Sequence, residues 1–284
     1  MFHAGGVSNR LGGAKTAALT QGACTKMKNN TLLYFEQAEF EAYVASFLNG
    51  EAAHDAMYRL KKEHSLRVLE NARQIGAELP PAQARLLELA ALYHDLGRFE
   101  QLRRFGTFLD AESLNHGRLG SLLLREERFL RGLDRRERGL VRLAVLMHNR
   151  YDLPAKLAPE LAPFCQALRE ADQLDILGIM RREIAPGKTP DPTVVMGLRD
   201  EPGAYTPALL ESAKTGQGVN YGAMRYVNDF RLLLYTWPAR MRFAASRRIL
   251  ARQGHMAVIL AGLPDSAEFA PLHANMAALL EQPK

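Results

Sequence analysis

Apolar residues recur every three to four positions from Thr31 almost to the end of the chain, which is the spacing of a buried helix face. Strict alternation of apolar and polar residues, the pattern of a half-buried strand, is nearly absent. The sequence therefore predicts an all-α fold. Helices are expected near residues 32–48, 55–78, 82–96, 114–130, 134–149, 161–182, 221–236, 239–253 and 265–282.

Glycine, proline and short polar residues indicate where these helices begin and end. Gly97 is a plausible C-cap for the helix that carries His94 and Asp95. Residues 110–113 offer an N-cap for the next helix. Pro238 directly follows Trp237 and is expected to separate two helices, because proline has no backbone N–H.

A length of 284 residues accommodates one large domain with appended segments. Residues 1–30 show no helical period, so we expect a disordered leader there and a single helical domain over 31–284. Residues 186–221 contain five prolines and five glycines, which predicts either a lid or a surface insertion. The helices of 221–282 are expected to pack on the bundle of 55–182, because a few isolated helices bury little surface.

Composition argues against several classes of protein. No apolar run approaches the roughly 18 residues of a membrane-spanning helix. The two cysteines, Cys24 and Cys165, provide no disulfide framework, so we expect a cytoplasmic protein. The net charge of +6 is spread, and the arginines of residues 125–142 alternate with acidic residues around a single aromatic, Phe129. We therefore expect neither a nucleic-acid nor a membrane partner.

Four histidines and two aspartates fall on apolar helix faces. His64, for example, shares a face with Val68 and Ile75. One buried histidine is usually a hydrogen-bonded core residue, but six ionisable groups buried without partners would be very costly. A metal centre would satisfy all of them together. The predicted ligands are His64, His94, Asp95, His116, His148 and Asp172.

The order of these residues resembles that of the HD-domain metal-dependent phosphohydrolase superfamily over roughly residues 31–182. The strings that carry the resemblance are Lys62-Glu63-His64-Ser65, Tyr93-His94-Asp95-Leu96-Gly97-Arg98-Phe99, Asn115-His116-Gly117, Met147-His148-Asn149 and Ala171-Asp172-Gln173-Leu174-Asp175. The resemblance implies an HD-type helical bundle with the metal site between its central helices and with additional C-terminal helices.

The resemblance also implies how two metal ions are shared among the ligands. Those implied for the first ion are His64, His94, Asp95 and Asp172. His116 and His148 match the positions that hold a second ion, with Asp95 bridging the two. Asp175 is the alternative carboxylate to Asp172. A nitrogen-rich set favours Fe, Mn, Zn, Co or Ni over Mg or Ca.

Two divalent ions can activate water for an in-line displacement on phosphorus, so such a site needs no side-chain nucleophile. We therefore predict a phosphohydrolase acting on a small, nucleotide-like phosphoester, with Asp95 at the centre of its catalytic machinery. Arg98 is the first candidate to bind substrate and stabilise transition-state charge, followed by Lys61 and Arg150. The alternative for each of these three is an ordinary surface charge.

Two other functions fit the same ligands. The di-iron oxygenases of this superfamily resemble the chain in ligand order and differ in pocket and surrounding shell. A sensor that binds a nucleotide without turnover is the second alternative. The sequence following His148 has no Gly-Tyr-Pro run like that of the cyclic-di-GMP phosphodiesterases, so the substrate stays open. Either a core or a homo-oligomer face is expected from Val227, Phe230, Leu232, Leu233 and Trp237.

Overall fold

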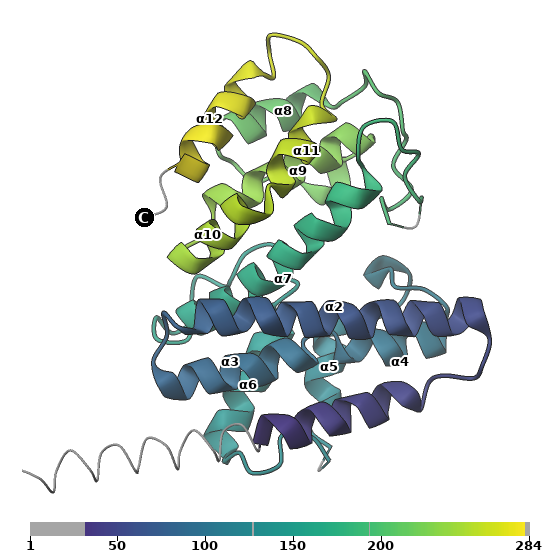
Figure 1. The fold of residues 1–284 in the computed structure, drawn as a ribbon, viewed down its shortest axis with the longest axis vertical. Helices are drawn as coiled ribbons and strands as arrows, with labels where there is room; N and C mark the ends of the chain where they lie inside the picture. The colour runs from purple at the N-terminus through teal and green to yellow at the C-terminus, as the bar shows by residue number, and fades with distance from the viewer. Residues whose placement is uncertain (1–31, 127, 193, 282–284) are drawn as a thin grey trace, which may run out of the picture.

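The computed structural model describes residues 32–126, 128–192 and 194–281, and over these residues the predicted all-α fold is confirmed (Figure 1). The predicted leader lies outside the described residues. A first helix spans residues 32–45. The helices that follow it in the N-terminal part are α2 (Ala52–Gly76), α3 (Pro81–Tyr93), α4 (Leu96–Phe105), α5 (His116–Leu123), α6 (Arg135–Met147) and α7 (Ala162–Glu183). The C-terminal part contains α8 (Pro207–Lys214), α9 (Val227–Ala239), α10 (Ala244–Gln253), α11 (His255–Ala261) and α12 (Ala270–Glu281).

Helix α7 lies between two groups of helices (Figure 1). It packs against α2, α3 and α6 of the first group and against α10 and α11 of the second. Its apolar residues are buried around most of its circumference, as Leu168 and Leu174 illustrate. Because α7 is buried on two sides, one of its faces packs on the first group of helices and the opposite face packs on the second.

Helix α10 of the C-terminal part packs against α2, and a side chain that follows α2 caps its N-terminus. The carboxylate of Glu78, just after α2, accepts hydrogen bonds from the first two backbone amides of α10, at 3.0 and 2.6 Å.

The residues predicted to form either a core or an oligomer face are buried inside the chain. They are Val227, Phe230, Leu232, Leu233 and Trp237. Their burial assigns them to the core.

The region around Gly97 differs from the prediction. Helix α3 ends at Tyr93 and α4 begins at Leu96, so Gly97 lies inside α4 and is not a C-cap. The reason is close packing of α4 on α5, because a β-carbon on Gly97 would collide with the backbone carbonyl of His116. The chain turns at the His94-Asp95 pair, which leaves both side chains at the junction of two helices.

Other boundaries were also wrong. Trp237 and Pro238 do not separate two helices, because they lie in the last turns of α9, where a proline interrupts little of the hydrogen-bond ladder. The segment 110–113 does not cap α5; Asn115 does, accepting the backbone N–H of Arg118 at 2.9 Å. Helix α5 also ends at Leu123, well short of the predicted residue 130.

Three short helices were not predicted: α4, α8 and α11. Helix α8 lies within the predicted loop of 186–221, where its apolar residues Leu209 and Leu210 are buried. None of the helices formed by the described residues is long and apolar enough to cross a membrane.

Candidate metal centre

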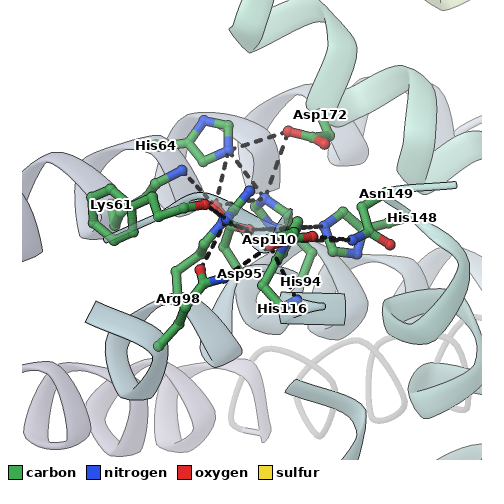
Figure 2. A network of polar contacts seen from close by, with 12 residues as sticks. Lys61, His64, His94, Asp95, Arg98, Asp110, His116, His148, Asn149 and Asp172 are labelled. Carbon is green, nitrogen blue, oxygen red and sulfur yellow. Dashed lines mark hydrogen bonds and ion pairs between the residues drawn. The ribbon is translucent and has the colours of Figure 1, made fainter. Parts of the chain in front are cut away.

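Six helices, α2 to α7, bring the six predicted ligands to one place (Figure 2). His64 lies in the middle of α2, and His94-Asp95 occupies the junction of α3 and α4. His116 is the first residue of α5, and His148 directly follows the last residue of α6. The sixth residue, Asp172, comes from α7. All six side chains are buried.

One group of donor atoms lies between α2 and α7. The Nε2 atoms of His64 and His94 are 3.1 Å apart. Oδ1 of Asp172 lies 3.2 Å from the first of these nitrogens and 3.7 Å from the second. Oδ2 of Asp95 lies 3.6 and 3.8 Å from the same two atoms. Two nitrogens and two carboxylate oxygens therefore face one small volume.

A second group of donors lies on the other side of Asp95. The Nε2 atoms of His116 and His148 are 3.0 Å apart. Oδ1 of Asp95 lies 3.4 Å from the first and 3.8 Å from the second. The two oxygens of this one carboxylate thus face two different pairs of imidazoles.

Each of the four imidazoles has its other nitrogen, Nδ1, paired with an oxygen. His64 pairs with Asp175 at 2.6 Å, and His116 pairs with Asp110 at 2.8 Å. The backbone carbonyls of residues 91 and 145 pair with the other two, His94 at 2.8 Å and His148 at 2.7 Å. A proton donated from Nδ1 leaves the lone pair on Nε2, which is the tautomer that binds a metal. In all four rings Nδ1 thus has an oxygen partner and Nε2 faces the other donor atoms, which is the orientation that a metal ligand needs.

The HD domain family model matches residues 62–177, a range that contains all six of these residues. The chain contains an HD domain. No curated protein and no solved structure matches it. The HD domain places this part of the chain in a superfamily whose members are, in general, metal-dependent phosphohydrolases.

The pKa shifts of His94, His116 and Asp95 favour the protonation states that bind a metal, which are a neutral imidazole and an ionised carboxylate. Burial lowers the pKa of His94 to about 4 and that of His116 to about 3, so both rings are neutral at pH 7. Burial alone would raise the pKa of Asp95, but Lys61 and His94 outweigh it and hold that pKa well below its usual range. In His64, the carboxylates of Asp172 and Asp175 outweigh burial and raise the pKa to about 9.

One buried atom of the HD domain indicates that a cation fits here. Oδ1 of Asp172 is inaccessible to solvent and accepts no hydrogen bond from the part of the chain that the structure describes. Buried polar atoms nearly always have a partner. Among the residues that the structure describes, two groups have ligand atoms close enough together to hold an ion: His64, His94 and Asp172, and His94, Asp95 and His148; neither includes His116.

The alternative ligand Asp175 lies on the far side of the His64 ring. It accepts from Nδ1 of that ring and from two guanidinium nitrogens of Arg67, at 2.6 and 3.1 Å. Asp172, in contrast, faces the Nε2 atom. The structure therefore places Asp175 as a support for His64 and not among the inward-facing donors.

The three predicted substrate cations occupy different positions. Nζ of Lys61 lies 3.0 Å from Oδ2 of Asp95, and Nε of Arg98 lies 3.6 Å from Oδ1 (Figure 2). Both side chains are partly accessible, with exposed fractions of 20% and 17%. Arg150 is exposed, two residues beyond His148. Lys61 and Arg98 therefore flank the carboxylate of Asp95, whereas Arg150 lies beyond the end of α6.

Sequence reasoning missed Asp110, which supports several parts of the site. Its carboxylate accepts from Nδ1 of His116 and from Arg98 at 3.0 Å. It also accepts from Gln101 at 2.9 Å. A further donor is Asn149, at 3.1 Å (Figure 2). The segment that carries it, between α4 and α5, has no helical periodicity that would predict an inward side chain.

Proposed function

We propose that this protein is a metal-dependent phosphohydrolase that uses two divalent ions to hydrolyse a small, nucleotide-like phosphoester. One observation carries the proposal: four imidazoles direct Nε2 toward the two oxygens of Asp95, while each Nδ1 is held by another oxygen. A core histidine needs no such common orientation. The arrangement is what two adjacent cation sites sharing one carboxylate would require.

In this proposal, the first ion is held by His64, His94, Asp95 and Asp172. The second is held by His116 and His148, with Asp95 shared between the two ions. Four imidazole nitrogens favour Fe, Mn, Zn, Co or Ni over Mg or Ca. The carboxylates of Asp110 and Asp175 keep two of the rings in the required tautomer.

Divalent ions bound side by side in such a site activate water and neutralise charge on a phosphoryl group. The chain supplies two further cations at the same place, Lys61 and Arg98, one beside each oxygen of Asp95. Their partial exposure lets them reach a phosphate that enters from solvent. They orient its oxygens and stabilise the charge that develops during displacement. Asp110 holds the guanidinium of Arg98 in place.

The test begins with the metal content of protein purified without chelator, followed by phosphate release from nucleoside monophosphates with Mn²⁺ under anaerobic conditions. We expect two ions per chain and phosphate release that is lost in Asp95→Asn. The matched control is Asp265→Asn, which changes an exposed aspartate of the C-terminal part.

The rival functions are distinguished by two further assays of the same protein, oxygen uptake in air with reduced iron and nucleotide binding. Oxygen uptake that requires reduced iron, without phosphate release, would establish an oxygenase. Nucleotide binding without turnover by the fully metal-loaded protein would establish a sensor. Either result would overturn the proposal.

A further inference from the structure

Two exposed tyrosines lie next to each other beyond the end of α6. Tyr151 follows His148 by three residues, and Tyr221 begins a short helical turn, Tyr221–Ala223, in the C-terminal part of the chain. Their ring centroids are 6.4 Å apart and the rings are nearly perpendicular, at 86°. The exposed fractions are 37% for Tyr151 and 45% for Tyr221. A part of the chain outside the HD domain thus contributes an aromatic ring beside the HD domain's own.

The backbone under this pair is tied to the helix that carries Asp172. Arg169 lies three residues before Asp172 on α7 and is buried. Its guanidinium donates to the backbone carbonyls of Arg150, at 3.0 Å, and Tyr151, at 2.6 Å. Because one rigid helix carries both Arg169 and Asp172, the position of Tyr151 is fixed relative to the candidate metal centre.

The ring of Tyr151 is itself supported by the C-terminal part. The guanidinium carbon of Arg240 lies 4.9 Å from its ring centroid, the geometry of a cation–π contact. Its hydroxyl lies against Gly218, in space that a β-carbon would occupy. The ring of Tyr151 is therefore held in place by other residues of the chain. Tyr221 has the larger exposed fraction of the two rings.

The backbone also places the pair beside the candidate metal centre. Tyr151 follows His148 by three residues, and Arg169, which donates to the Tyr151 carbonyl, precedes Asp172 by three residues on α7. Burial raises the pKa of Tyr221 to about 12, with smaller contributions from the neighbouring Tyr151 and from Asp172, which agrees with this placement.

We propose that Tyr221, supported by Tyr151, is the subsite that binds the flat ring of the substrate, a nucleobase, while the phosphate lies at the metal centre. This inference rests on the proposed function. Aromatic side chains stack on any base because every base has a π face. Arg240, which is also paired with Asp152, packs against the ring of Tyr151, and Arg169 holds the backbone carbonyl of Tyr151, so both keep the pair in place.

The experiment compares two classes of substrate that differ only in the base. Ribose 5-phosphate and the four common nucleoside 5′-monophosphates have the same phosphate and the same leaving hydroxyl. We expect the wild-type protein to show a higher kcat/KM for at least one nucleotide than for ribose 5-phosphate. Tyr221→Ala should reduce that ratio on the order of 5- to 100-fold, the range expected for loss of one base–aromatic stack.

Two control variants accompany it. Tyr221→Phe keeps the ring and should keep the ratio within about twofold, since stacking needs no hydroxyl. Tyr34→Ala removes a tyrosine that is 69% exposed on the first helix. Because Tyr34 is not part of the proposed subsite, this variant should also keep the ratio of kcat/KM values within about twofold. Metal content and circular dichroism of each variant show whether it is folded and loaded. An equal loss on both substrate classes in Tyr221→Ala would refute the subsite, as would a wild-type protein without preference for the base.

Failure of the proposed function gives a separate result. If no phosphate is released from any of these compounds, their binding is measured by calorimetry. Nucleotide binding that exceeds that of ribose 5-phosphate and falls in Tyr221→Ala would support the subsite although the hydrolase proposal fails. Equal binding of both classes would refute the subsite as well.

Discussion

Asp110→Asn should weaken the second metal ion selectively. The two oxygens of Asp110 accept from the side chains of His116, Arg98, Gln101 and Asn149. Two longer hydrogen bonds of 3.4 Å come from the side chain of Asn115 and from the backbone N–H of His116. Asparagine has one acceptor oxygen and one amino group, so at least one of these donors would then face another donor. The hydrogen bond to Nδ1 of His116 would also lose the negative charge of its acceptor.

The size of the effect follows from that hydrogen bond. A bond to a charged group is worth about 1.5–3 kcal/mol, and a neutral bond about 0.5–1.5 kcal/mol. The difference of about 1–1.5 kcal/mol corresponds to roughly a tenfold change in dissociation constant. Changes in the residues that support metal ligands typically weaken metal binding about 10- to 100-fold, which agrees with this value.

The assay is titration of metal-free protein with Zn²⁺ or Mn²⁺ against a chelating indicator, which resolves two binding steps. Asp110→Asn should raise the dissociation constant of the second ion about 10- to 100-fold and change the first by less than about threefold. Asp175→Asn is the reciprocal variant, because Asp175 holds His64, a ligand proposed for the first ion. It should weaken the first step and spare the second. If both variants weakened the same step, or neither weakened any, the separation of the site into two halves would be wrong.

Three further predictions concern the fold. Glu78→Ala removes the acceptor of the first two amides of α10 and should lower the free energy of unfolding in urea by about 1–2 kcal/mol; an unchanged value would show that α10 needs no such cap. Gly97→Ala should lower the free energy of unfolding by about 3 kcal/mol or more, because the new β-carbon would collide with α5. Gly139→Ala, inside α6 with free space around it, should raise the free energy of unfolding by about 0.5–1 kcal/mol. Burial raises the pKa of Cys165 to about 11 from 9, so little thiolate forms at pH 8. In a Cys24→Ser variant, where Cys165 is the remaining thiol, its reaction with a disulfide reagent should be at least about 100-fold slower in the folded protein than in unfolding urea. Equal rates would contradict the burial of Cys165.

Much of the fold was predictable from local patterns, and the errors have identifiable causes. The long helices α2 and α7 were predicted because their apolar residues repeat over many turns. Short helices such as α8 were missed because two turns give too few repeats to distinguish from a loop. Gly97 was misread because a glycine after a helical run usually marks the end of a helix, whereas here it permits two backbones to approach closely.

The six inward-facing residues were also predictable, since an ionisable group on an apolar stripe is visible in the sequence alone. Their common orientation was not, because it depends on partners of Nδ1 that come from elsewhere. Two of these partners are backbone carbonyls, which leave no trace in side-chain patterns. The other two are Asp110 and Asp175, and one of them lies in a segment without periodicity.

The amino-acid sequence alone determined the helical class of this protein and the identity of the residues that meet at its centre, because burial on a helix repeats every turn and can be read along the chain. The family resemblance implied how those residues divide between two ions, but only the tertiary structure shows which oxygen of Asp95 faces each pair of imidazoles. It also decided that Tyr221 lies beside Tyr151, 70 residues earlier in the chain. Such neighbours are set by the packing of whole helices on α7, and no local pattern in the sequence encodes that packing.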